Sequence, residues 1–183
     1  MTIHFLTIIL LITILSGFVI SLFSSKHHEK IISNIALSTV LLQGILNIGL
    51  IIQWMYNGYN AINLKEIIIY QTTDYYFLID FLIDKVSLVF LTIGSMLTIM
   101  ITYYSRYYLH LEHGYKRFFN TILFFNLGYV VTILAGNFET LFIGWEILGV
   151  SSFLLIAFYR ERYLPVRNAV KVFSIYRFAL GQR

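Results

Sequence analysis

Residues 139–159, ETLFIGWEILGVSSFLLIAFY, decide the fold of this chain. The run is about as long as the roughly 20 mostly apolar residues that a helix needs to cross a bilayer. One carboxylate, Glu146, stands near its middle. A charge at the centre of a bilayer costs about 2.5–3.5 kcal/mol on insertion scales, so such residues are rare and usually functional. The stretch therefore predicts a membrane helix that carries either a protonatable group or one partner of an ion pair.

The composition of the whole chain agrees with this interpretation. Of its 183 residues, 58% are hydrophobic and 12% are charged, and the mean hydropathy is +0.78. Ordinary soluble domains carry about 25% charged residues, so the composition indicates an integral membrane protein. Cysteine is absent, which excludes a disulfide framework and a cysteine-ligated metal. The sequence contains no nucleic-acid-binding motif, so we expect no nucleic-acid partner.

Apolar runs separated by short polar breaks predict an all-α polytopic protein with five to six spans, forming a single membrane domain over residues 1–183. A proline, Pro165, suits the first turn of the last helix, because its missing N–H has no partner there. Residues 64–80 contain two β-rich runs around a polar turn, which predicts a small β-hairpin between the second and third spans. The expected spans are residues 3–23, 31–55, 82–103, 118–135 and 139–159, with a partial sixth helix over residues 165–183.

Basic residues are divided unequally between the two sides of the expected bundle. Eight follow the first, third and fifth spans, whereas the long segment after the second span carries Lys65 alone. The positive-inside rule then places the basic loops in the matrix or cytoplasm and the N-terminus on the opposite side. The eight residues are Lys26, Lys30, Arg106, Lys116, Arg117, Arg160, Arg162 and Arg167.

Glu146 is the main candidate for proton chemistry. It follows Glu139 by seven residues, which places both on one helical face with Glu146 about 10 Å deeper. Burial or a neighbouring cation would change its affinity for protons from the value in water, as a proton-handling group requires. The alternative is a structural carboxylate that is satisfied by one neighbouring donor.

The expected sixth helix supplies candidate electrostatic neighbours for Glu146. Arg167, Lys171 and Ser174 follow one another at spacings of four and three, which places them on one helical face. Arg177 lies three residues further on. We take Lys171 and Arg177 as candidates for the proton pathway, whereas Arg167 is closer to the interface and suits a snorkelling role.

Other polar or small residues are assigned structural roles. Small residues of the fifth span favour close helix packing; they are Gly144, Gly149, Ser151 and Ser152. Charged residues before and at the start of the third span are interpreted as anchors; they are Asp80, Asp84 and Lys85. His110 and His113 are suitably spaced for a metal, but no third ligand completes a shell, so we expect no metal site.

These residues resemble the N-terminal portion of NADH dehydrogenase subunit 5, the antiporter-like membrane subunit of respiratory complex I. The strongest match covers residues 137–158 and is built around Gly144-Trp145-Glu146. The matching motifs extend over about half of the chain. The others are Asp84 with Ser87, Tyr104-Ser105 followed by Tyr107-Tyr108-Leu109, Arg117-Phe118-Phe119, and the pattern of Ala169, Lys171, Phe173 and Arg177.

The resemblance implies a membrane-arm subunit of NADH:ubiquinone oxidoreductase, in which quinone reduction elsewhere drives proton translocation. Glu146 matches a proton-pathway carboxylate that is coupled to a lysine on a later, broken helix. The resemblance implies that this chain binds no cofactor, while NADH, FMN, iron–sulfur clusters and ubiquinone bind elsewhere in the complex. Expected partners are other membrane-arm subunits and lipids such as cardiolipin. The expected location is the mitochondrial inner membrane, with the N-terminus in the intermembrane space, rather than a bacterial plasma membrane.

The chain departs from the family pattern in two ways. Phe178-Ala179-Leu180 follow Arg177 where the family usually has Val-Gly-Asp, so the acidic residue is missing. The family's pumping unit also needs more helices than 183 residues supply. We therefore expect a second polypeptide to carry the rest of a split subunit. Two other functions remain open, which are a structural scaffold subunit of the same complex without a working proton path, and a cation/proton antiporter subunit.

Overall fold

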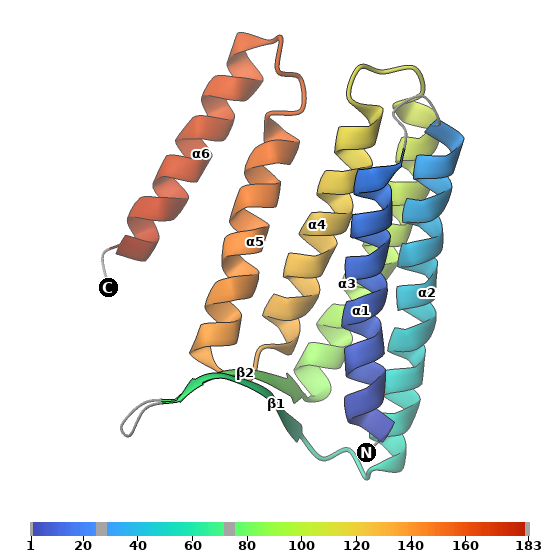
Figure 1. The fold of residues 1–183 in the computed structure, drawn as a ribbon, viewed down its shortest axis with the longest axis vertical. Coiled ribbons are helices and arrows are strands. Elements are labelled where there is room, and N and C mark those ends of the chain that lie inside the picture. Colours follow the sequence, from blue (N-terminus) through green and yellow to red (C-terminus); the bar gives the residue numbers. More distant parts are fainter. Residues whose placement is uncertain (1, 25–28, 72–75, 182–183) are drawn as a thin grey trace.

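The structure is a computed structural model that describes residues 2–24, 29–71 and 76–181. These residues form six helices and one two-stranded antiparallel sheet (Figure 1). The helices are α1 (Thr2–Phe23), α2 (Glu29–Tyr56), α3 (Lys85–Tyr108), α4 (Tyr115–Leu134), α5 (Phe138–Ile156) and α6 (Tyr163–Gly181). The strands are β1 (Ile62–Gln71) and β2 (Tyr76–Ile83).

Five helices, α1 to α5, are long and apolar enough to cross a membrane. Many of their large hydrophobic side chains are exposed, among them Ile12, Ile45 and Met96. Exposed apolar surface on this scale suits contact with lipid rather than with water. The predicted polytopic helical fold is therefore confirmed. α6 is the additional helix: it is as long as α5 but is not apolar enough to count as a span.

The hairpin between the second and third spans is also confirmed. β1 pairs with β2 in a register that joins Ile62 to Ile83 and Gln71 to Tyr76. Its extent differs from the prediction, because Leu82 and Ile83 belong to β2 and not to the third span. β2 thus ends three residues beyond the predicted hairpin, at Ile83 instead of residue 80.

The third span begins at Lys85 because Asp84 caps the helix. The Asp84 carboxylate accepts a hydrogen bond of 2.7 Å from the Ser87 backbone N–H, and the Asp84 N–H donates to the Ser87 hydroxyl at 2.9 Å. This capping box satisfies donors that the first helical turn cannot pair internally. The structural role predicted for Asp84 is confirmed. α6 likewise begins earlier than predicted, at Tyr163, so that Pro165 lies inside its first turn.

The hairpin is fastened to the turn that joins α4 and α5. The Asp80 carbonyl accepts from the Gly136 N–H at 2.8 Å, and the Asp80 N–H donates to the Thr140 hydroxyl at 3.0 Å. Asn137 caps α5 by accepting from the Thr140 N–H, and its amide nitrogen donates to the Leu78 carbonyl at 2.6 Å. Asp80 is buried at this junction, as expected for a structural anchor. The start of α5, and with it the position of Glu146, is therefore fixed by β2.

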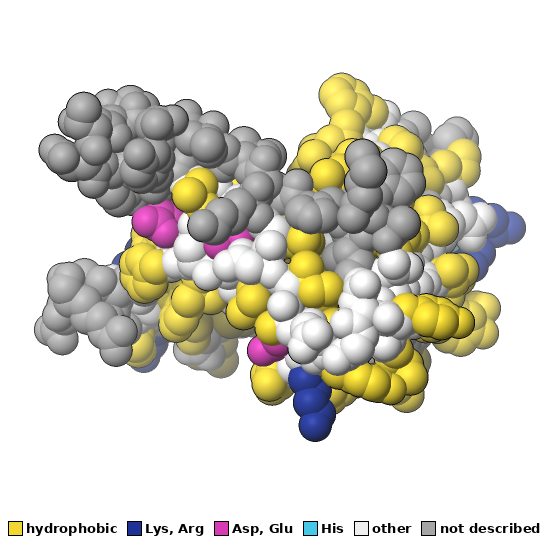
Figure 2. Space-filling view, turned by 90° about the horizontal axis from the view of Figure 1, so that it is seen from below, with side chains coloured by type: hydrophobic (Ala, Val, Ile, Leu, Met, Phe, Trp, Pro, Cys, Tyr) yellow, Lys and Arg dark blue, Asp and Glu magenta, His cyan; other side chains and the backbone are white. Residues whose placement is uncertain are grey.

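The two ends of the bundle differ in charge. The connections after α1, α3 and α5 lie at one end, and the hairpin and the α4–α5 turn lie at the other (Figure 1). The visible described surface at the hairpin end is mostly hydrophobic or uncharged (Figure 2). Lys85 adds one cation to this end, and Lys26, one of the eight basic residues counted in the sequence, lies outside the described residues. The asymmetry that predicts membrane orientation is thus present in the folded chain.

Helices α1 to α4 pack together, whereas α5 lies on α4 and α6 on α5 (Figure 1). A line of uncharged polar side chains, most of them buried, runs between α1, α2, α3 and α4, and we call it the polar seam. Its members do not carry a charge, and each has at least one interhelical hydrogen bond. They are Ser21, Gln43, Asn47, Thr92, Ser95, Asn120 and Asn126.

One contact of the seam joins α2 to α4 through a pair of amides. Gln43 and Asn126 are both 0% exposed and exchange two amide hydrogen bonds, one of them 3.4 Å from Gln43 Nε2 to Asn126 Oδ1. Asn47 continues the seam by donating to Thr92 at 3.3 Å and to Ser95 at 3.4 Å. Unpaired amides are costly in an apolar interior, so these contacts fix how the helices face one another.

Replacing Asn126 by leucine should destabilise the bundle, because it leaves the Gln43 amide buried without its partner. We expect a loss of about 1–2 kcal/mol in the free energy of unfolding. The double variant Q43L/N126L should recover most of it, because both polar groups are then gone. The measurement is denaturant unfolding in detergent micelles, with N34L, at an exposed position of α2, as control. Equal losses for N126L and the double variant would contradict the pairing.

Candidate functional site

The backbone of α5 lies very close to α4, which brings the Glu146 helix against the bundle. A Cβ atom added at Gly144 would be 2.6 Å from the Thr132 backbone nitrogen and 2.5 Å from its hydroxyl oxygen. A Cβ at Gly128 of α4 would similarly meet Ile147 at 2.7 Å. Ser151 is buried and bonds back to the Ile147 carbonyl at 2.7 Å. The predicted packing role of these small residues is confirmed for Gly144 and Ser151.

Glu146 forms a two-pronged ion pair with Arg177 of α6. Arg177 Nη1 donates to Glu146 Oε1 at 2.8 Å, and Arg177 Nη2 lies 2.8 Å from Glu146 Oε2. This fork-to-fork geometry is the strongest arrangement available to an arginine and a carboxylate. The Glu146 side chain is 20% exposed and that of Arg177 is 49% exposed. The pair therefore lies at the open side of the α5–α6 contact rather than deep inside the bundle.

A second polar contact beside the ion pair fixes the rotation of α6. The Tyr176 hydroxyl donates to the Trp145 carbonyl of α5. Tyr176 can approach because a Cβ atom at Gly149 would be only 2.5 Å from its ring. The packing role predicted for Gly149 thus serves α6. Since Arg177 follows Tyr176 directly, this contact places the guanidinium opposite Glu146.

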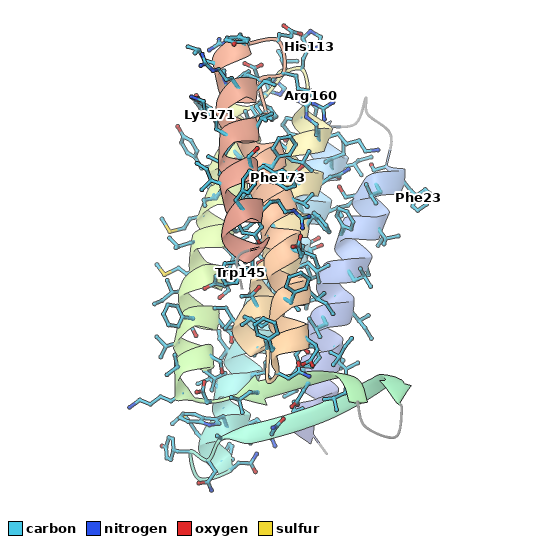
Figure 3. All side chains as sticks on the ribbon, turned by 90° about the vertical axis from the view of Figure 1, so that its left-hand side faces the viewer. Phe23, His113, Trp145, Arg160, Lys171 and Phe173 are labelled. Carbon is cyan, nitrogen blue, oxygen red and sulfur yellow. The ribbon has the colours of Figure 1, made fainter. Side chains whose placement is uncertain are left out.

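The structure brings only one of the two predicted neighbours to Glu146. Arg177 pairs with Glu146, whereas Lys171 is exposed and lies towards the loop end of α6, away from the level of Trp145 (Figure 3). Among the described residues Glu146 pairs with Arg177 and not with Lys171, so the place of Lys171 on the proton pathway stays a prediction. Arg167 lies 5.9 Å from the Tyr163 ring centroid, in keeping with its predicted interfacial role.

The carboxylate partner of Arg177 is on another helix. Phe178 follows Arg177 in the chain, where the resemblance led us to look for an acidic group on the same helix. Glu146 supplies that negative charge from α5 instead. The family resemblance implies that Glu146 has a lysine partner outside these 183 residues. Among the described residues, Arg177 already balances the charge of Glu146.

The histidines do not gather with acidic residues into a metal site among the described residues. His110 Nδ1 lies 2.8 Å from Glu29 Oε2, so its ring ties the end of α3 to the start of α2. His113 is exposed. His27 and His28 lie outside the described residues. The polar seam and the Tyr176–Trp145 contact were not predicted, although Gln43, Asn47 and Asn126 are visible in the sequence as amides within apolar runs.

The sequence profile of the family described as "NADH-Ubiquinone oxidoreductase (complex I), chain 5 N-terminus" matches residues 70–119. The match covers part of the hairpin, all of α3 and the first turn of α4, and ends before Glu146. The chain is related to the N-terminal portion of the subunit L and chain 5 family. The resemblance found in the sequence is thereby confirmed, and the antiporter-like membrane subunits of complex I are the relatives of this chain.

Similar sequences extend the family relationship along the chain. NADH-quinone oxidoreductase subunit L of Neisseria meningitidis is 35% identical over 102 residues, which are 55% of this chain and 15% of that protein. Chain 5 of Mytilus edulis is 33% identical over 130 residues, or 70% of this chain and 22% of that protein. Subunit L of Escherichia coli is 29% identical over 167 residues, which are 89% of this chain and 27% of that protein. The chain thus spans less than a third of the length of these relatives.

The fold also resembles that of a solved structure. A chain of the membrane-bound sulfane sulfur reductase, an archaeal respiratory membrane complex, matches with a TM-score of 0.69 and 18% sequence identity. The match covers 93% of this chain and 33% of that chain. At this identity the likeness establishes the arrangement of the helices and hairpin.

Proposed function

We propose that this chain contributes Glu146 to a proton path in the membrane arm of an NADH:quinone oxidoreductase. The observation that carries the proposal is the ion pair between Glu146 and Arg177, formed between a membrane-spanning helix and the helix that follows it. The similarity to subunit L and chain 5 supports the proposal that this pair acts within an NADH:quinone oxidoreductase.

The pair can act as a gate for protons through its charge. While Arg177 is paired with Glu146, the guanidinium compensates the charge of the carboxylate. We propose that Arg177 moves away during turnover and that a proton then replaces it as the partner of the carboxylate, because an uncompensated charge within a membrane is costly. Opening and closing of one contact thus changes the protonation of one group, which is the elementary step of a proton relay. Lys171, six residues before Arg177 on α6, is proposed as a second cation on this path.

The isosteric variant E146Q tests the proposal. It removes the ionisable group while preserving size and a hydrogen-bond acceptor for Arg177. A positioned acid–base group commonly contributes about 10²–10⁴-fold to a proton-transfer step, so we expect fewer protons translocated for each NADH oxidised. Proton uptake into vesicles is measured together with NADH oxidation, and native gels report assembly. E161Q makes the same charge change at an exposed position of the α5–α6 loop. Unchanged pumping by assembled E146Q complexes would overturn the role of Glu146.

A scaffold function is the second candidate, and one observation favours it. Arg177 already balances the charge of Glu146. In a scaffold function, the sole role of this carboxylate is to attach α6 to α5. This function predicts that E146Q weakens assembly while assembled complexes pump normally. The vesicle experiment above therefore separates the two functions, because it measures assembly and pumping independently.

The proposed setting is the mitochondrial inner membrane, with the basic loops in the matrix and the N-terminus in the intermembrane space. The charge asymmetry supports this orientation, and both mitochondrial-type chain 5 and bacterial subunit L are among the relatives. We further propose that the NADH, FMN, iron–sulfur and ubiquinone sites belong to other subunits. A second polypeptide that carries the remaining helices stays a prediction, which mass spectrometry of the purified complex tests.

A further inference from the structure

One oxygen atom of the polar seam is buried without a hydrogen-bond partner. Asn47 of α2 is 1% exposed, and its Nδ2 donates to the Thr92 and Ser95 hydroxyls of α3. Both hydroxyls already donate their protons to backbone carbonyls of α3, at 2.7 and 2.9 Å. They cannot also donate to Asn47 Oδ1, which is unpaired among the described residues. An unpaired amide oxygen in an apolar interior is costly, so a further donor would stabilise it.

Thr102 carries a second oxygen of this kind, further along α3. Its hydroxyl is 1% exposed and has no partner among the described residues, whereas the Thr92 hydroxyl bonds back to its own helix. The relative height of the two helices follows from Gly44 of α2, where an added Cβ atom would be 3.2 Å from Ile99 of α3. Thr102 is three residues beyond Ile99 toward the basic end. Asn47 is three residues beyond Gly44 toward the hairpin end, because α2 and α3 run in opposite directions (Figure 1).

The Gln43–Asn126 pair stands at the height that separates these two oxygens. Gln43 directly precedes Gly44, near the middle of the 28-residue helix α2. Each amide of the pair donates to the other, and both side chains are 0% exposed. Neither amide has an unpaired buried atom within the described part of the chain. The pair is therefore satisfied without water, unlike the oxygens on either side of it.

A cavity of about 620 Å³ lies between α2 and α3 at the hairpin end. Its lining extends from Tyr59 and Lys85, near the ends of the two helices, to Thr92. Thr92 is also the residue that accepts from Asn47, at 3.3 Å. Since a water molecule occupies only about 30 Å³ in the liquid, the cavity has room to bring water from this end of the bundle toward Asn47.

A second cavity, of about 290 Å³, opens at the basic end among α2, α3 and α4. Charged or ionisable side chains line it, among them Glu29, Arg106 and His110. Arg106 follows Thr102 by four residues, which is about 6 Å along α3. Charged groups at the end of a membrane bundle are stable only when they are solvated or paired, so this cavity is a source of water close to Thr102.

We propose that water enters the bundle of α1 to α4 from both ends, and that the Gln43–Asn126 pair keeps the two sets of water molecules apart. One set donates to Asn47 Oδ1, and the other bonds to the Thr102 hydroxyl. A continuous file of water would let protons leak across the membrane and discharge any gradient that a pump builds. The amide pair is thus a barrier against proton leak. This inference concerns α1 to α4 and does not depend on the role of Glu146.

Cryo-electron microscopy of the purified complex, at a resolution that shows ordered water, tests the two sets of water molecules. We expect density within hydrogen-bonding distance of Asn47 Oδ1 and of the Thr102 hydroxyl, and none between Gln43 and Asn126. The variant N47L removes the first oxygen, so its map should lose the water there and keep the water at Thr102. A protein donor in place of water at either oxygen, or a continuous file of water past the amide pair, would refute the proposal.

The rate of passive proton leak tests the barrier. Liposomes that contain the complex are given a pH gradient without NADH, and a pH-sensitive dye reports its decay. Q43A/N126A removes the amides and leaves space for water, so we expect the leak to rise about tenfold or more. Q43L/N126L fills the space with apolar side chains that exclude water, and should leak no more than the unmodified complex.

N34A, at an exposed position of α2, is the control for the leak, and native gels report assembly of each variant. Two results would show that the pair is not a barrier. One is an assembled Q43A/N126A complex that holds the gradient as well as N34A does, and the other is an equal leak from the alanine and leucine double variants. If Q43A/N126A does not assemble, the map of the unmodified complex still decides whether water passes the pair.

Discussion

Complexes that carry Arg177→Met are expected to assemble poorly, because the variant leaves the Glu146 carboxylate without its counter-ion. The pair is made of two contacts of 2.8 Å between α5 and α6. Exposed ion pairs in water contribute only about 0–1 kcal/mol. Glu146, however, stands in the middle of a membrane span, where an uncompensated charge costs about 2.5–3.5 kcal/mol. We therefore expect R177M to lower the free energy of assembly by about 2.5–3.5 kcal/mol.

The double variant E146Q/R177M distinguishes loss of charge balance from loss of packing. It removes both charges, so assembly should recover most of what R177M loses, and the two substitutions should not be additive. R167M is the matched control, because Arg167 lies on the same helix and contacts the Tyr163 ring rather than a carboxylate. The measurement is the amount of assembled complex on native gels and its midpoint of thermal dissociation. If R177M and R167M give the same amount of assembled complex and the same dissociation midpoint, the ion pair does not contribute to assembly.

Gly144→Ala is expected to separate α4 from α5. The added Cβ would lie 2.6 Å from the backbone nitrogen of Thr132, which cannot move aside as a flexible side chain can. Overpacking of this kind typically costs about 1–3 kcal/mol. Because the helix that must shift carries Glu146, we expect the Glu146–Arg177 contact to be disturbed as well. The midpoint of thermal unfolding in detergent should fall accordingly.

Gly49 provides the control for this substitution. It lies in α2, and a Cβ at that position would have nothing within 4 Å. G49A should therefore be neutral or raise stability by up to about 1 kcal/mol, since alanine is the better helix former. T132A combined with G144A should recover only part of the loss, because it removes the hydroxyl and keeps the backbone nitrogen. Two results would contradict this explanation. One is full recovery of stability in T132A/G144A, and the other is an equal unfolding midpoint for G144A and G49A. Either would show that the close contact between the α4 and α5 backbones does not limit stability.

The spans and the hairpin could be predicted because each depends on local pattern. Runs of about 20 apolar residues mark helices, and alternating β-rich residues mark strands. The boundary at Leu82 was wrong because hydropathy does not separate a strand from the helix that follows it. The capping box of Asp84 and Ser87 decides that boundary, and its spacing is readable in the sequence.

The composition of the site could be predicted only in part. Glu146 is conspicuous as a carboxylate within an apolar run, and the basic residues of α6 follow from their spacing. Which of them meets Glu146 depends on the rotation of α6. That rotation is set by Tyr176 against Gly149 and the Trp145 carbonyl, contacts across about 30 residues that no local pattern contains. The pairing of Gln43 with Asn126, 83 residues apart, was beyond reach for the same reason.

The polar seam has a consequence for how the helices are held together. Its contacts are made by amides and hydroxyls, such as Gln43, Asn126 and Ser95, which carry no charge. The contact between α5 and α6 depends instead on two opposite charges, those of Glu146 and Arg177. Loss of either charged group leaves the other unbalanced within the attachment of α6, whereas the seam contains no charge that can lose its partner.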